Sequence, residues 1–112
     1  MYFAPANTRV VGILDVRTYT FSTASTSLSS QTWKYWGAVA MGTSVYFVPK
    51  RTSDIGVFDT TTNTFSTTPT GLGGWGGYSG GVAVGDYIYF GPQGSNGVGV
   101  FHPATSNFLS VA

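Results

Sequence analysis

The chain has 112 residues, 42% of them hydrophobic and only 8% charged, with a formal net charge of +1 and no cysteine. This length suits one domain with a buried core, and the lack of cysteine excludes disulfides, thiolate nucleophiles and thiolate zinc sites. The few Lys and Arg residues form no basic run of the kind that nucleic-acid binding requires, and no apolar stretch approaches the roughly 20 residues of a membrane helix. We therefore expect neither a nucleic-acid partner nor a membrane span.

Three similar segments follow one another along the chain. The tetrapeptides YFAP, YFVP and YFGP begin at Tyr2, Tyr46 and Tyr89, which are 44 and 43 residues apart. Downstream of them GILDVRTYTFST, GVFDTTTNTFST and GVFHPATSNFLS align in the same register, and upstream YWGAVAMGTSV aligns with YSGGVAVGDYI. A repeat of about 40 to 45 residues with four short strands is the unit of a β-propeller.

The repeats predict a single propeller segment with a partial blade at 1–34 and blades at 35–77 and 78–112. Runs of β-branched and aromatic residues predict four strands in the complete middle repeat, at 35–41, 45–48, 55–59 and 64–67. The intervening GTS and TTTN segments are hairpin turns, so neighbouring strands should be antiparallel. No segment has a helical apolar stripe. We therefore expect an all-β chain of β-propeller blades, each of four antiparallel strands, with about two and three-quarter blades and eleven strands.

The strand at 45–48 is apolar on both of its alternating faces. Val45 and Phe47 lie on one face, and Tyr46 and Val48 lie on the other. A sheet with this pattern is covered on both sides, as a blade between two other blades would be. Three aromatic residues recur in register and are expected in the core: Phe21, Phe65 and Phe108.

The segment GLGGWG at 71–76 has the spacing G-x-G-x-x-G of dinucleotide-binding loops. That spacing indicates phosphate binding only where a helix opens from its last glycine, whereas here a strand is predicted to follow. The corresponding segment of the preceding repeat has a single glycine, Gly37. We therefore interpret these glycines as an interblade loop that needs positive φ angles, and not as a nucleotide site.

The repeats resemble blades of the YVTN type of β-propeller, in the segments YFVPKRTSDIGVFDTTTNTF and GGVAVGDYIYFGPQGSNGVGVFHPATSNF. The pairing of IYFGP with VFHPATSNF is also similar to kelch-like propellers. Two departures are the short VG turn before DYIYF and His102 at the position of Asp15 and Asp59. The resemblance implies a propeller fold. Most members of both families are binding or scaffold proteins, many at cell surfaces, and a minority are enzymes.

Catalytic side chains are scarce, because the chain has one His, four Asp, no Glu and no Cys. Asp15, Asp59 and His102 occupy one turn position on successive blades, which would hold them far apart. We therefore expect neither a general acid and base pair nor a metal site from them, and we interpret His102 as a residue that bonds within its turn. Chemistry of the galactose-oxidase type, known on kelch-like rings, needs a Cys and several His that are lacking here. We expect a protein that is not an enzyme, with no metal and no cofactor.

Residues suited to binding gather on the predicted loops that join the second strand to the third and the fourth strand to the next blade. Four of the five basic residues fall on this long-loop face, with Asp54 as its only acid: Arg9, Lys34, Lys50 and Arg51. Exposed rings beside polar groups are typical of sugar sites, and clustered cations attract anions. We expect a glycan or anionic ligand here, with these contact residues: Trp33, Lys34, Trp36, Lys50, Arg51 and Trp75.

Two alternatives remain open for these loops. The charges can serve solubility, and the aromatic rings can fill the space between blades, above all Tyr35 and Tyr78, which recur in register. The chain would then be a structural or protein-interaction scaffold. An enzyme would need a partner domain to supply catalytic residues.

Eleven strands cannot close a propeller ring. The terminal blades would keep uncovered apolar faces, which promote association. We expect either a head-to-tail homo-oligomeric ring, in which two copies give about six blades, or the remainder of a longer chain. The sequence leaves the compartment open.

Overall fold

The computed structural model describes residues 1–3, 10–26, 35–50, 52–70, 77–93 and 97–111. Within these ranges the chain forms eleven strands and no helix, in three antiparallel sheets. No helix long and apolar enough to cross a membrane occurs among these residues. The N-terminal sheet has the order β1-β2-β3, with β1 (Tyr2–Phe3), β2 (Val10–Asp15) and β3 (Thr20–Ser25).

The other two sheets each have four strands in consecutive order. The middle sheet consists of β4 (Tyr35–Met41), β5 (Ser44–Pro49), β6 (Asp54–Asp59) and β7 (Thr64–Pro69). The C-terminal sheet consists of β8 (Tyr78–Val84), β9 (Tyr87–Pro92), β10 (Val98–His102) and β11 (Asn107–Val111). The strands predicted for the middle repeat are confirmed, with the second, third and fourth each one or two residues longer than expected.

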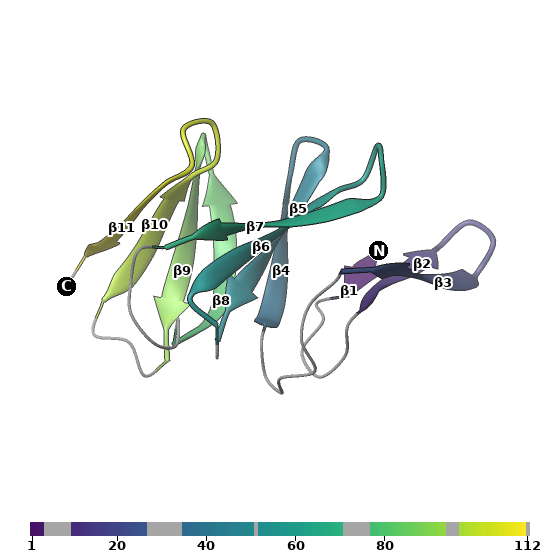
Figure 1. The fold of residues 1–112 in the computed structure, drawn as a ribbon, viewed down its shortest axis with the longest axis horizontal. Helices are drawn as coiled ribbons and strands as arrows, with labels where there is room; N and C mark the ends of the chain where they lie inside the picture. Colours follow the sequence, from purple (N-terminus) through teal and green to yellow (C-terminus); the bar gives the residue numbers. More distant parts are fainter. Residues whose placement is uncertain (4–9, 27–34, 51, 71–76, 94–96, 112) are drawn as a thin grey trace.

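The three sheets stand one beside the next in chain order, face against face, within overall extents of 43 × 32 × 19 Å (Figure 1). Their first strands lie closest together, with β4 between β1 and β8. The hairpin turns of the middle and C-terminal sheets lie along one edge, at the top in Figure 1. The all-β, antiparallel organisation predicted from the repeats is thus confirmed.

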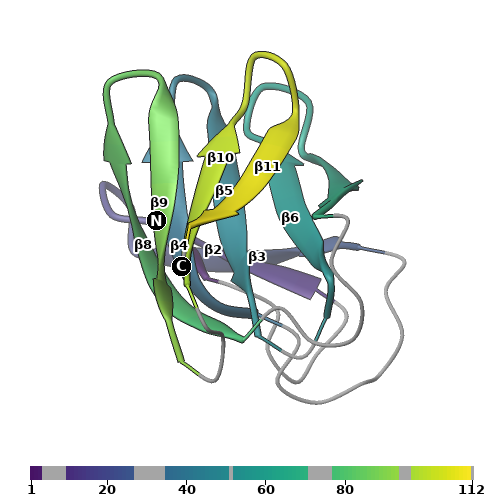
Figure 2. The same cartoon turned by 90° about the vertical axis from the view of Figure 1, so that its left-hand side faces the viewer.

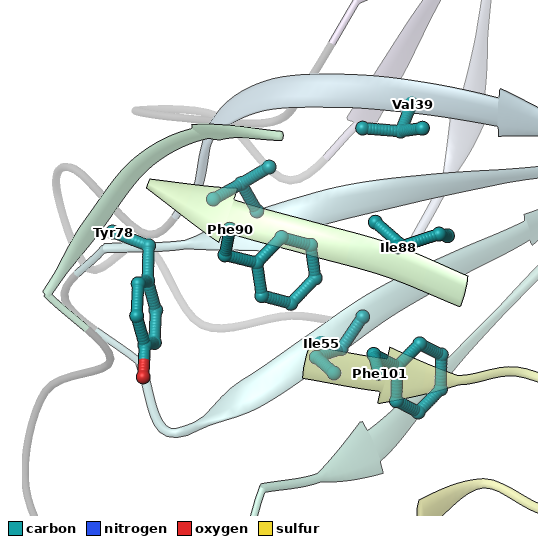
Figure 3. Close-up of a cluster of buried hydrophobic side chains, with 7 residues drawn as sticks. Val39, Ile55, Tyr78, Ile88, Phe90 and Phe101 are labelled. Atoms are coloured by element: carbon teal, nitrogen blue, oxygen red, sulfur yellow. The ribbon is translucent and has the colours of Figure 1, made fainter. Parts of the chain in front are cut away.

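The core consists of two layers of side chains, one on each side of the middle sheet. Between the N-terminal and middle sheets lies the first layer: Val11, Tyr35, Val45, Phe47 and Phe58. Between the middle and C-terminal sheets lies the second: Val39, Val48, Ile55, Tyr78, Ile88, Phe90 and Phe101 (Figure 3). Both faces of β5 are therefore covered, as its two-sided apolar pattern predicts.

A glycine between two phenylalanine rings recurs in each sheet. A Cβ at Gly56 would lie 3.1 Å from the rings of both Phe47 and Phe65, which stack with centroids 6.2 Å apart. In the C-terminal sheet the same arrangement joins Phe90 and Phe108 across Gly99, with centroids 6.1 Å apart. The missing side chain lets each pair of rings lie flat over the strand and form one aromatic surface.

Phe21 departs from the prediction that all three recurring phenylalanines belong to the core. Phe65 and Phe108 pack against the two layers, whereas Phe21 is 62% exposed. Phe21 lies beside Gly12 together with Phe3 and belongs to neither core layer, and none of the described sheets covers it. The prediction was wrong because a repeat pattern specifies which face a residue occupies, but not whether a neighbour is present.

The three turns β2–β3, β6–β7 and β10–β11 share a residue with positive φ. Tyr19, Asn63 and Ser106 each have a positive φ, between 54° and 58°, at the same position of the repeat. In the middle sheet Asp59 Oδ1 accepts hydrogen bonds from the Thr61 hydroxyl (2.6 Å) and the Thr61 amide (2.9 Å). These two bonds stabilise the carboxylate and lower the pKa of Asp59 below its ordinary value. The aspartate is thus a turn residue, as its position predicts.

The Gly99→Ala substitution is expected to destabilise the C-terminal sheet. The new Cβ would lie 2.9 Å from Phe108 Cζ and 3.1 Å from Phe90 Cδ2, so one of the stacked rings must move, at a cost of about 1–3 kcal/mol. Gly80→Ala is the matched control, because a Cβ there meets no atom within 4 Å. Urea denaturation of the two variants measures both effects. Equal stabilities would contradict the packing role of Gly99.

The Tyr78→Phe substitution is expected to leave the free energy of unfolding unchanged or to raise it by about 1 kcal/mol. The Tyr78 hydroxyl is buried and has no hydrogen-bond partner among the described residues. An unpaired buried hydroxyl carries a desolvation cost that phenylalanine does not, and the ring keeps its contact with Phe90 at 5.7 Å between centroids. Denaturant titration is the measurement, and a loss above about 1 kcal/mol would show that the hydroxyl is paired in solution.

The Thr61→Val substitution is expected to raise the pKa of Asp59 towards its ordinary value, since it removes one of the two bonds to the carboxylate. Because the pKa of Asp59 is lower in the folded state, its hydrogen bonds stabilise the fold at pH values above the unfolded pKa of about 4. This stabilisation is lost as the pH falls through the pKa of Asp59 in the folded state. Carboxyl NMR titration measures the shift. Thr18→Val is the control, because that hydroxyl bonds Thr20, and an equal effect of both variants would refute the assignment.

Candidate functional site

The candidate site lies on the edge of the sheets opposite the hairpin turns. This long-loop edge is where β4 and β8 begin and β5 and β9 end, and it is marked by Tyr35, Pro49, Tyr78 and Pro92. Two of the six residues predicted to contact a ligand, Trp36 and Lys50, meet here, with Lys50 Nζ 5.6 Å from the centroid of the Trp36 ring. The other four lie outside the described residues: Trp33, Lys34, Arg51 and Trp75.

β4 has an irregularity beside Trp36. Tyr35 pairs with Pro49 and Ala38 pairs with Phe47, so β4 has one more residue than β5 between these two pairs. Such a bulge lets two consecutive side chains leave the normal alternation. Tyr35 is buried and Trp36 is 45% exposed. Burial, together with the nearby negative charge of Asp54, raises the pKa of Tyr35, so this phenol stays neutral and acts as a core residue.

Lys50 connects the middle sheet to the C-terminal sheet. Its ammonium donates a hydrogen bond to Gln93 Oε1 at 2.5 Å. Its carbonyl oxygen accepts a bond from Gly77 N at 3.0 Å, and the Gly77 carbonyl accepts one from Gln93 N at 2.7 Å. Gly77 has a φ of 75°, in the region that glycine adopts without strain. Backbone and side-chain bonds therefore both fix the position of the Lys50 head group between the two sheets.

The cluster of Trp36, Lys50 and Gln93 can bind a polar ligand that has a flat or charged part. One of the three ammonium N–H groups of Lys50 is directed to Gln93, which leaves donors for an anion. The exposed Trp36 ring can stack on a sugar ring or another flat group. Gln93 adds amide donors to the same surface.

The described charged residues lie at both edges of the sheets. Lys50 and Asp54 lie at the long-loop edge, and four charged residues lie at or near the hairpin turns: Asp15, Arg17, Asp59 and Asp86. Arg17 Nε is 3.9 Å from Asp15 Oδ1, and both side chains are exposed, so this ion pair adds little. Three of the four basic residues predicted for the long-loop face, Arg9, Lys34 and Arg51, lie outside the described part of the chain, so the predicted excess of positive charge on this face stays a prediction.

His102 lies at the hairpin edge of the C-terminal sheet, far from the cluster along its strand. Its Nδ1 is 3.0 Å from Thr105 Oγ1, and its ring stacks on Tyr87 with centroids 4.7 Å apart. The bond to Thr105 is the turn interaction that the sequence predicts. Across the described residues, no three His or Asp side chains gather as metal ligands would.

Two features were missed by sequence reasoning. Gln93 was not singled out, although it is 43 residues from Lys50 and so occupies the equivalent position of the next repeat. The other is a cavity of about 200 Å³ on the C-terminal sheet, away from the long-loop edge, lined by Tyr87, Val100, His102, Asn107, Phe108 and Leu109. The repeat alignment could have found Gln93, but no sequence signal points to the cavity.

Comparisons with known proteins bear on the fold alone. No protein-family model matches the chain, and no curated protein matches it. Among solved structures, a chain of Kuenenia stuttgartiensis hydrazine synthase is similar, with a TM-score of 0.75 and 14% sequence identity over 97% of this chain. The chain spans 31% of the length of that neighbour. At this identity the similarity shows a shared arrangement of strands and carries no function across.

Proposed function

We propose that the chain is a non-catalytic binding module made of β-propeller blades, and that it recognises a carbohydrate carrying anionic groups at the long-loop edge. The three stacked antiparallel sheets support the blade assignment, because each repeat of 43 or 44 residues corresponds to one sheet. The strand order and hairpin turns within each sheet are those that propeller blades have.

The observation that carries the proposed function is the position of the Lys50 ammonium. It lies 5.6 Å from the centroid of the exposed Trp36 ring and is fixed by its bond to Gln93. A cation held beside an aromatic face offers a sugar ring a stacking surface and offers its carboxylate or sulfate group a charge partner. Preorganisation of this kind lowers the entropy lost on binding. Trp33, Lys34, Arg51 and Trp75 are proposed to extend the same surface.

A scaffold that only assembles with other proteins is the second candidate function. It is favoured by the uncovered apolar face of the C-terminal sheet, where Val82 and Leu109 are 57% and 62% exposed. Assembly through that face and ligand binding at the long-loop edge use different residues.

The binding proposal is tested with immobilised heparin as the anionic polysaccharide and dextran as the neutral one. We expect heparin to bind the chain and dextran to bind it more weakly. Trp36→Ala and Lys50→Gln should each weaken heparin binding by roughly threefold to tenfold, as expected for loss of one stacking or cationic contact of about 1 kcal/mol. Biolayer interferometry measures these affinities.

Matched controls are available at the opposite edge. Arg17→Gln removes an exposed cation, and Tyr19→Asn removes an aromatic ring that is 83% exposed while keeping a residue type that tolerates its positive φ. Both controls should bind heparin as the unmodified chain does. Absence of heparin binding, or equal losses in all four variants, would refute a specific site at the long-loop edge.

A further inference from the structure

The outer face of the C-terminal sheet is apolar, and no other described sheet covers it. Alternate residues of β8 to β11 point away from the middle sheet, and in Figure 2 this sheet faces the viewer. We name this surface the C-terminal face and define it by its apolar residues: Val82, Val84, Tyr87, Tyr89, Val98, Val100, Leu109 and Val111. Six of these eight side chains are at least 40% exposed. An apolar patch of this kind marks an interaction surface.

The centre of the equivalent face of the middle sheet is buried. The residues 43 positions before Val82 and Val98 are Val39 and Ile55, which are 7% and 0% exposed because the C-terminal sheet covers them. Three positions are polar in the middle sheet and apolar in the C-terminal face: Ser44 is replaced by Tyr87, Ser66 by Leu109 and Thr68 by Val111. At these three positions the C-terminal face is therefore more apolar than the face of the middle sheet that it repeats.

A complementary face lies at the other end of the molecule. We name it the N-terminal face and define it by Met1, Phe3, Gly12, Leu14 and Phe21. The positions one repeat later carry the residues with which the middle sheet packs on the N-terminal sheet: Val45, Phe47, Gly56, Phe58 and Phe65. The N-terminal face keeps the arrangement of a glycine between two phenylalanines, since a Cβ at Gly12 would lie 3.3 Å from both Phe3 and Phe21.

One contact recurs at both sheet interfaces. The Tyr2 ring packs on Phe58 of the next sheet with centroids 5.5 Å apart, and the Tyr46 ring packs on Phe101 with centroids 5.8 Å apart. Tyr2 and Tyr46 are 44 residues apart, and the next tyrosine of the series, Tyr89, lies 43 residues further on the C-terminal face. In a following sheet, Tyr89 would pack on the residue equivalent to Phe58. In the N-terminal sheet, that equivalent residue is Leu14.

We propose that the C-terminal face binds the N-terminal face of a second copy of this chain, head to tail, with Tyr89 of one copy packed on Leu14 of the other. The chain thereby repeats between copies the interface that it forms twice within itself. The cavity beside Tyr87 and His102 opens on the C-terminal face, and an aliphatic side chain of the second copy would fill it. Two copies related by rotation would cover every such face, which is how a head-to-tail interface closes.

This inference is independent of the proposed ligand, because none of the interface residues belongs to the cluster of Trp36, Lys50 and Gln93. Its first test is the mass of the chain in solution by light scattering over a range of concentrations. We expect a discrete species with twice the chain mass of 11.8 kDa. A monomer at all concentrations would overturn the proposal.

A pair of lysine variants tests the face itself. Leu109→Lys introduces a charge into the C-terminal face at a side chain that is 62% exposed in the single chain, so folding should persist while association is lost by at least tenfold. Val16→Lys is the control, because Val16 is 54% exposed in the turn after β2 and lies outside both faces. Association that survives Leu109→Lys, or that is lost equally in both variants with circular dichroism unchanged, would overturn the assignment.

The head-to-tail direction is tested by crosslinking, which the natural absence of cysteine makes specific. One variant carries Tyr89→Cys and the other Leu14→Cys, and a bis-maleimide linker is used because packed sheets lie about 10 Å apart. We expect crosslinked product only when the two variants are mixed. A control mixture pairs the Tyr89→Cys variant with a Thr62→Cys variant, whose cysteine lies on a hairpin turn, and this mixture should give no crosslinked product. Product from either variant alone, or equal product with Thr62→Cys, would overturn the head-to-tail arrangement.

Discussion

The packing of the phenylalanine rings of one sheet onto the preceding sheet is the interaction on which the structure depends. Each sheet alone has a single layer of strands and cannot bury an apolar side chain on either face. The rings of Phe47 and Phe65, flattened over Gly56, cover the N-terminal sheet, and the rings of Phe90 and Phe108, flattened over Gly99, cover the middle sheet.

The candidate site is a result of the same stacking. The middle and C-terminal sheets pack face to face, so the ends of β5 and β9 lie close together. The Lys50 ammonium therefore bonds the Gln93 side chain directly, and the backbones of these two residues are linked by hydrogen bonds to Gly77. The bulge in β4 lies where the core meets the surface, because Tyr35 is buried and Trp36 is exposed at the edge beside the lysine.

Much of the fold could be predicted from the sequence, because the repeats fix the strands, the hairpin turns and the face on which each residue lies. Tyr35 and Tyr78 were identified as core candidates in this way, and both are buried. Burial itself was predictable only where a neighbouring sheet exists, so the expectation failed at Phe21. For the site, aromatic and basic residues on long loops indicated Trp36 and Lys50, whereas the bond to Gln93 depends on the distance between two sheets, which no local pattern encodes.

The bond between Lys50 and Gln93 joins equivalent positions of consecutive repeats, and it exists because those positions carry different residues. Two lysines at this spacing would repel each other, and two glutamines would place no charge beside Trp36. A chain of identical repeats could not hold such a pair. The sequence difference between the two repeats therefore places a cation on the middle sheet and its hydrogen-bond acceptor on the C-terminal sheet.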